Sequence, residues 1–217
     1  AGFFGPGVRL LMGATFAVAI AAAAEIIRRR DLAIKVGSFA SEDIPSVLAG
    51  VSVVSGFGVA YAAHAVYGMI SSGAAFGLMG AIGLSALVVS LVYSPALGVL
   101  GLLGSYLTPF LVSSSSPNYV ALTIFVSLVT CVTFALDARR PSAWLLAGSV
   151  VGHSGWTALI AWSDAPPVCS TFLLLVAAAV ATFGAEFAGR RTERDTLLRI
   201  AAFVAPLVLG GVIWVDR

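Results

Sequence analysis

This 217-residue chain has two histidines, and they are the side chains that could take part in the widest range of chemistry. His64 stands in AYAAHAVYG, where Tyr61 and Tyr67 lie three positions away on either side, so the three rings share one side of a helix. His153 stands in AGSVVGHSGW, inside another long apolar stretch. Because imidazole ordinarily titrates near pH 6.5, either histidine could carry a proton or contact a substrate. Each could equally donate one hydrogen bond to a neighbouring helix and have no further role.

A second candidate is the stretch GLLGSYLTPFLV, in which Pro109 interrupts an apolar run. Proline cannot donate to the carbonyl of Ser105 and crowds it, so we expect the outer third of this helix to kink or unwind. The hydroxyls of Thr108 and Ser105 could then satisfy the freed carbonyls. Broken helices hold substrates in transporters, yet proline also occurs in membrane helices that only pack. The break therefore has a functional and a structural interpretation.

Carboxylates near two arginine clusters form a third set. Glu25 precedes Arg28 and Arg29 by three and four residues, and Glu186 precedes Arg190 by four. These spacings place each acid and its cation on one helix face. The pattern favours ion pairs at the membrane surface, and a proton or ion path is the alternative.

Signatures of catalysis are missing from the sequence. It has no His/Glu zinc motif, no Gly-rich phosphate loop and no acid pair at catalytic spacing, and the GHSGW string lacks the spacing of a nucleophile elbow. We expect Cys131 and Cys169 to lie at different depths, too far apart for a disulfide and poorly placed for a metal. The sequence predicts neither an enzyme nor a bound cofactor.

Composition places all of these residues in a membrane. Of the residues, 59% are hydrophobic and 10% are charged, against roughly 45–50% and about 25% in soluble domains. A helix needs about 20 apolar residues to cross a bilayer, and charges, prolines and serines divide the chain into about eight such lengths. Only the MISSGAA stretch, residues 69–75, separates the second length from the third. The predicted segments are 7–27, 46–70, 71–93, 95–113, 119–136, 142–162, 168–188 and 197–215.

Cations indicate how these segments are oriented, because cytoplasmic loops gather Lys and Arg. With the first residue outside and eight crossings, ten of the twelve cations fall on the inner side, and only Arg9 and Arg217 fall outside. The sequence therefore predicts a polytopic all-α bundle with both termini on the outer, periplasmic face. A net charge of +2 gives no reason to expect nucleic-acid binding.

Glycines at close spacing, such as Gly98, Gly101 and Gly104, predict a tight helix bundle, since small residues let helix backbones approach in lipid. We treat residues 1–217 as a single transmembrane helical domain. The chain opens on Ala1 without a signal peptide, and we expect it to be a segment of a longer membrane protein.

Four motifs in order carry a family resemblance: GFFGPGVRLLMGA, AEIIRRR, AYAAHAVYGMI and SPALGVLGLLGSYLTPFLVSS. Over roughly its first 115 residues the chain resembles a bacterial family of predicted multi-pass membrane proteins of unknown function, domain of unknown function family 2339. The resemblance implies an inner-membrane location and a parent protein with more crossings, often preceded by a polar or coiled-coil region. It implies no activity and no catalytic residues.

Two functions fit these observations. Sparse buried charge and abundant small-residue packing favour a structural or accessory component of a membrane assembly, with membrane lipids and other membrane-protein subunits as partners. The alternative is a transporter for a small or amphiphilic solute. Its cavity would be lined by the break at Thr108 and Pro109 together with Tyr61, His64, Tyr67 and His153.

Overall fold

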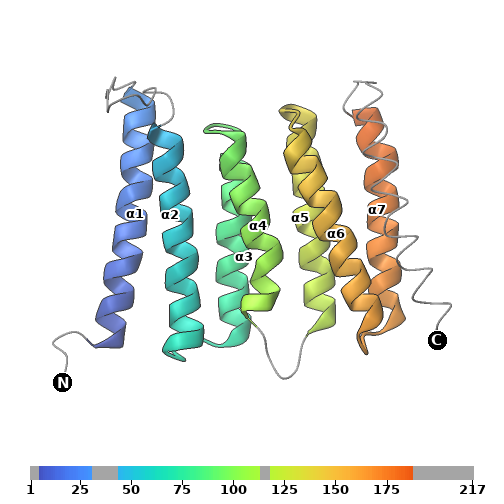
Figure 1. Cartoon of the computed structure of the whole chain (residues 1–217), viewed down its shortest axis with the longest axis horizontal. Helices are drawn as coiled ribbons and strands as arrows, with labels where there is room; N and C mark the ends of the chain where they lie inside the picture. The colour runs from blue at the N-terminus through green and yellow to red at the C-terminus, as the bar shows by residue number, and fades with distance from the viewer. Residues whose placement is uncertain (1–4, 31–43, 113–117, 188–217) are drawn as a thin grey trace. The chain divides into compact units, whose positions relative to one another are not determined.

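The computed structural model describes residues 5–30, 44–112 and 118–187, with side chains described as far as Val180. Regular structure within these ranges is entirely helical, without a strand, so the predicted all-helical fold is confirmed. The helices form two compact units, Ala1–Ser114 and Ser115–Arg217. The chain is coloured from blue to red in Figure 1, where successive helices within each unit run in opposite directions.

The first unit packs its helices in sequence order. Helix α1 lies along α2, α2 also touches α3 and α4, and α3 and α4 pack along each other. One buried cluster joins Ala24, Ala49 and Leu97, and another joins Ala60, Ala75, Met79 and Val112. The elements of this unit are α1 (Pro6–Arg30), α2 (Ile44–Tyr61), the π-helical turn η1 (Ala62–Val66), α3 (Ser72–Val89) and α4 (Pro95–Leu111).

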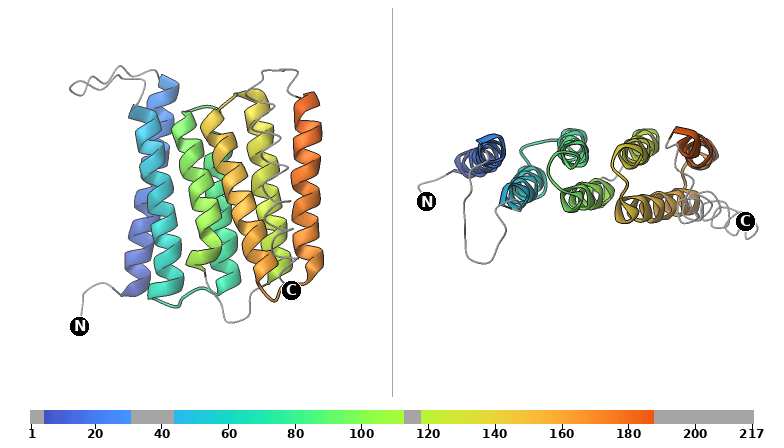
Figure 2. Two further views of the ribbon diagram at one scale, coloured as in Figure 1. Left: turned by 45° about the vertical axis from the view of Figure 1, so that its right-hand side comes forward. Right: turned by 90° about the horizontal axis from the view of Figure 1, so that it is seen from above.

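The second unit is a three-helix cluster of α5 (Tyr119–Arg139), α6 (Ala143–Trp162) and α7 (Pro167–Phe187) in the described residues. Each of these helices contacts the other two, and the view from above in Figure 2 shows α5, α6 and α7 grouped in this way. Phe134 and Leu146 form its buried cluster, with Val150 and Val180 packed against them. The interior of this unit therefore lies between three helices.

Local signals in the sequence set several helix starts. Ser71 and Asn118 are N-caps whose side chains accept hydrogen bonds from the backbone N–H groups of Ala74 and Ala121. Pro95 occupies the first turn of α4, where its missing N–H costs nothing. These caps agree closely with the predicted starts of the third, fourth and fifth segments.

Seven of the predicted segments correspond to α1–α7, and the eighth, 197–215, lies outside the described residues. By length and apolar composition, 4 helices of the described chain could cross a membrane: Pro6–Arg30, Ile44–Val66, Ser72–Val89 and Tyr119–Arg139. Pro95–Leu111 and Pro167–Val180 are shorter apolar helices.

The second predicted segment ends differently from our expectation of a regular helix to residue 70. The α-helix stops at Tyr61, and a π-helical turn follows in which the N–H of Tyr67 donates to the carbonyl of Ala62. Gly68 then adopts a φ of 59°, a left-handed conformation that glycine takes without strain. The chain reverses here and enters α3.

The expected unwinding of the fourth helix does not occur. Helix α4 continues through Pro109 and ends at Leu111. The proline stands in the last turn, so it removes only one backbone hydrogen bond before the helix would end in any case. The hydroxyl of Thr108 donates 2.8 Å to the carbonyl of Gly104 instead of the freed carbonyl of Ser105.

Close backbone approach joins α3 to α4. A Cβ atom on Gly101 would stand 2.8 Å from both the carbonyl oxygen of Gly83 and the backbone nitrogen of Leu87. A Cβ atom on Gly83 would collide with the hydroxyl of Ser105. Glycine is required at position 101 because real Cβ atoms do not approach backbone atoms so closely, and a side chain at position 83 would displace the hydroxyl of Ser105. The predicted tight packing around Gly101 is confirmed.

Candidate functional site

His153 lies between the three described helices of the second unit. It lies on α6 and is 3% exposed. Its Nδ1 is 2.8 Å from the hydroxyl of Thr130 on α5, and its Nε2 is 3.1 Å from the backbone carbonyl oxygen of Leu173 on α7. A carbonyl only accepts hydrogen bonds, so Nε2 carries a hydrogen. One imidazole thereby links three helices through polar contacts in an apolar interior.

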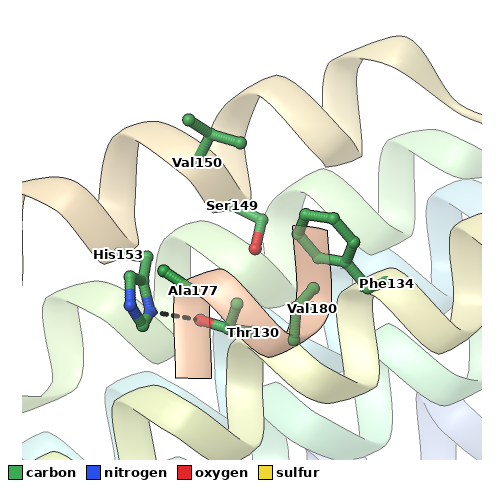
Figure 3. Close-up of a pocket in the computed structure, with 7 residues that line it drawn as sticks. All are labelled: Thr130, Phe134, Ser149, Val150, His153, Ala177 and Val180. Atoms are coloured by element: carbon green, nitrogen blue, oxygen red, sulfur yellow. Dashed lines mark hydrogen bonds between the residues drawn. The ribbon is translucent and has the colours of Figure 1, made fainter. Parts of the chain in front are cut away.

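A small pocket opens beside this imidazole. Figure 3 shows side chains from α5, α6 and α7 converging on it, with His153 at one side and Phe134 and Val180 at the other. Ser149, one turn before His153 on α6, adds a buried hydroxyl. The pocket has room for about one water molecule. Its lining residues are Thr130, Phe134, Ser149, Val150, His153, Ala177 and Val180.

Further buried hydroxyl side chains lie along α5 and α6. Thr123, Ser127 and Thr130 share one face of α5 at spacings of four and three residues, and all three are buried. Ser127, Thr130, Thr133 and Thr157 donate to the carbonyl four residues earlier, as buried hydroxyls in helices commonly do. The hydroxyls of Thr123 and Ser154 are buried without a hydrogen-bond partner in the described residues.

A second polar cluster lies at one end of the first unit. The carboxylate of Glu25 accepts hydrogen bonds from Arg28 at 2.6 and 2.9 Å, from Arg29, and from the hydroxyl of Tyr93 at 2.8 Å. The guanidinium of Arg28 also stands 5.7 Å from the centroid of the Tyr93 ring, within cation–π range. Tyr93 belongs to the turn between α3 and α4, so this cluster connects that turn to the end of α1.

The Tyr93 phenol responds to this environment. It lies outside the membrane-spanning helices, and burial raises its pKa above the ordinary value. The hydrogen bond to Glu25 raises the pKa further, because the phenol can donate only while it keeps its proton.

The second predicted ion pair joins Glu186 to Arg190. Glu186 lies in α7, but its side chain and the whole of Arg190 fall outside the described residues.

His64 and its neighbouring tyrosines do not form a shared lining. The π-helical turn replaces the expected regular spacing, and Nδ1 of His64 contacts the backbone carbonyl of Ile70 at 3.1 Å. Tyr61 is exposed, and Tyr67 is half-buried at the end of the turn. The described contact of His64 is therefore with the backbone of the turn that follows it in the chain.

Ser105 and Thr108 are completely buried on α4, while Pro109 is half-buried. Ser105 has no hydrogen-bond partner for its hydroxyl among the described residues, and this oxygen faces the α carbon of Gly83. His64, Ser105 and Thr108 belong to the first unit and His153 to the second.

Sequence reasoning missed the partners of the strongest sites. Thr130 carried a usable signal, since it recurs with Thr123 and Ser127 at helical spacing. Tyr93 carried no signal for its contact, because Glu25 lies 68 positions away in the sequence. The carbonyl of Leu173 could not be identified from the sequence, because every residue carries the same backbone acceptor.

Cys131 is exposed and Cys169 is buried, and both are free thiols, which confirms that they are unpaired. Within the described ranges, no group of three His, Cys, Asp or Glu side chains is placed to hold a metal ion.

A sequence model of the family described as "Predicted membrane protein (DUF2339)" matches residues 1–215. The match continues well beyond residue 115, where the motif resemblance ended. No curated protein and no solved structure matches the chain. The family description gives a membrane location without an activity.

Proposed function

Because this chain belongs to the DUF2339 family of predicted membrane proteins, we propose that it is a structural or accessory component of an assembly in the bacterial inner membrane. It has eight crossings, with both termini on the periplasmic side. It performs no catalysis and needs no cofactor. Its partners are membrane lipids and other membrane-protein subunits, and it does not bind nucleic acid.

Two tryptophans on α6 support the crossing count. Trp144 and Trp162 lie near opposite ends of this helix and are 82% and 76% exposed. Eighteen residues at about 1.5 Å each separate them by about 27 Å, close to the hydrocarbon thickness of about 30 Å. Tryptophan favours the two membrane interfaces. This spacing supports α6 as a crossing although His153 and several serines lower its apolar content.

The observation that carries the accessory role is the one-sided packing of α1. This helix has 25 residues, and only Ala17 and Ala24 are buried. Within the described ranges its extensive packing is with α2 alone. The most apolar window of α1 is 11% buried, compared with 50% for α5. A helix with so much free surface suits contact with a transmembrane helix of another subunit.

The free face of α1 is held in a fixed position. Gly13 packs so closely on Val59 of α2 that an added Cβ would stand 2.8 Å from that side chain. At the other end, Glu25 accepts the hydrogen bond from Tyr93. Rigid presentation of an apolar face lowers the entropy lost on association. The exposed large side chains on this face are Val8, Leu11, Met12, Phe16, Val18 and Ile26.

The transporter alternative has less support. A pocket for a drug-sized solute has a volume of about 300–1,000 Å³, whereas the pocket beside His153 accommodates about one water molecule. His64 and Thr108 each bond to nearby backbone, and they belong to a different unit from His153.

Site-specific photo-crosslinking in the native membrane tests the accessory role. A photoreactive phenylalanine analogue at Phe16 probes the free face of α1, and one at exposed Val151 of α6 is the matched control. We expect a discrete adduct with a different membrane protein from position 16 and none from position 151. Adducts with lipid alone, or only with a second copy of this chain, would contradict the proposal.

A further inference from the structure

The three polar contacts of His153 and the Thr130 hydroxyl cannot all be filled while the ring is neutral. The hydroxyl oxygen of Thr130 lies 2.8 Å from Nδ1 of His153 and 2.9 Å from the carbonyl oxygen of Val126. One hydroxyl has one hydrogen, which can be donated to only one of these acceptors. The ring's Nε2–H is already directed at the carbonyl of Leu173.

Two hydrogen-bond patterns follow from this geometry. In the neutral ring Nδ1 is an acceptor, so Thr130 donates to it and turns its hydrogen away from the carbonyl of Val126. In the protonated ring Nδ1–H donates to Thr130, and the hydroxyl then donates to Val126. The protonated ring fills all three contacts at the heavy-atom distances that the structure shows.

We propose that His153 is a reversible proton-binding site in the interior of the second unit, with the Thr130 hydroxyl switching between the imidazole and the carbonyl of Val126 as the charge changes. Its ligand is a single proton. Proton uptake transfers one proton from hydronium to the lone pair of Nδ1, releases water and leaves the ring with one positive charge.

In the described part of the second unit, the His153 ring faces the dipoles of oxygen atoms and no oppositely charged side chain. Helix α6 carries no charged residue. On α5 the nearest charged groups are Asp137 and Arg139, about 10 Å or more along the helix from Thr130, and Cys131 is exposed. On α7, Cys169 lies one turn before Leu173, and Glu186 stands about 20 Å beyond it along the helix. The charged ring is therefore stabilised by hydrogen bonds to the Thr130 hydroxyl and the Leu173 carbonyl.

The pocket supplies a place from which the proton can arrive. His153, Thr130 and Ser149 all line it, and it has room for about one water molecule. His153 stands midway between Trp144 and Trp162 on α6. Intramembrane ionisable residues that face a bundle interior commonly take part in proton binding or transfer. This site is independent of the accessory role, because it lies on α5, α6 and α7 and does not involve α1.

Histidine-ring nitrogen NMR tests the proposal on the full chain in lipid nanodiscs, with ¹⁵N-labelled histidine. The chain has 2 histidines, so His64→Gln leaves the signal of His153 alone. Between about pH 8 and about pH 5, we expect a ring with hydrogen on Nε2 only to change reversibly into a ring with hydrogen on both nitrogens. In Thr130→Val, proton binding should weaken about tenfold, the effect of one hydrogen bond to a charged group. Thr130→Ser, which keeps the hydroxyl, should bind as the parent does.

A ring with a single hydrogen across the whole pH range would overturn the proposal. A neutral ring with its hydrogen on Nδ1, or unchanged proton binding in Thr130→Val, would also overturn it. If Thr130→Val fails to fold, the titrations of the parent protein and of Thr130→Ser still test whether His153 binds a proton reversibly.

Discussion

The hydroxyl of Tyr93 donates a hydrogen bond of 2.8 Å to Oε2 of Glu25, a residue 68 positions earlier in the chain. Helix α1 packs extensively on α2 alone among the described helices. The Tyr93 bond therefore gives the end of α1 a second attachment, to the turn between α3 and α4. The same carboxylate pairs with Arg28 and Arg29.

Replacing Tyr93 with phenylalanine should loosen the end of α1. The hydrogen bond to Glu25 is lost while the ring remains, so we expect a loss of about 1 kcal/mol in unfolding free energy. Hydrogen exchange should increase in the last turns of α1 and stay unchanged in α5. Tyr119→Phe, at the start of α5, is the matched control. Equal effects of the two substitutions would show that the Glu25 bond does not anchor α1.

High pH should release the same attachment. Because burial and the Glu25 bond raise the Tyr93 pKa in the folded state, the bond is fully present below the unfolded value of about 10. Its stabilisation is lost as pH rises through the folded-state pKa. The phenolate absorbance of the parent minus that of Tyr93→Phe should give a midpoint above about 10. A midpoint at or below this value would contradict the assignment.

Adding a methyl group at Gly101 should disrupt the contact between α3 and α4. The new Cβ would stand 2.8 Å from backbone atoms of Gly83 and Leu87, and such overpacking costs about 1–3 kcal/mol. Gly77→Ala on α3 is the control, since nothing lies within 4 Å of its added Cβ. Alanine is the better helix former, so Gly77→Ala should be neutral or stabilising. Thermal unfolding in detergent measures both, and similar stabilities would argue against the close contact.

Pro109→Ala should stabilise the protein, because α4 is already helical through this position. Alanine restores a backbone N–H that can donate to the carbonyl of Ser105. Thermal unfolding and helicity should rise or stay unchanged. A fall in stability would instead indicate that the chain depends on an interrupted helix there, as the transporter alternative requires.

Cysteine labelling should reveal the orientation of the second unit. In a chain without Cys131 and Cys169, Asp164→Cys in the turn between α6 and α7 should react with a membrane-impermeant maleimide in intact cells. Pro141→Cys, between α5 and α6, should react only after the membrane is opened. Both positions are exposed in the structure. Reversed labelling would contradict the proposed orientation.

Most of the fold was predictable from the lengths of the apolar stretches and from the residues that start helices. Helices α3 and α5 begin where Ser71 and Asn118 cap them, and α4 begins at Pro95. Such residues are recognisable in the sequence. The π-helical turn at His64 was not predictable, since it depends on how the chain reverses around Gly68 and bonds to Ile70. The effect of Pro109 was overestimated, because a proline in the last turn of a helix removes only one backbone hydrogen bond before the helix ends.

The candidate site was predictable only in part. Burial of His153 followed from its place in an apolar segment, and the pairing of Glu25 with arginines followed from helical spacing. Thr130 and Tyr93 reach their partners across helices and turns. Such contacts depend on helix rotation and packing, which periodicity alone does not determine.

The most direct test of the accessory role is purification of the full-length protein in a mild detergent or native nanodiscs, followed by mass spectrometry of everything recovered with it. We expect another membrane protein in stoichiometric amount, and its recovery should fall when Phe16 on the free face of α1 is replaced by tryptophan. Recovery of the chain as a lone monomer, with no associated protein, would contradict the account.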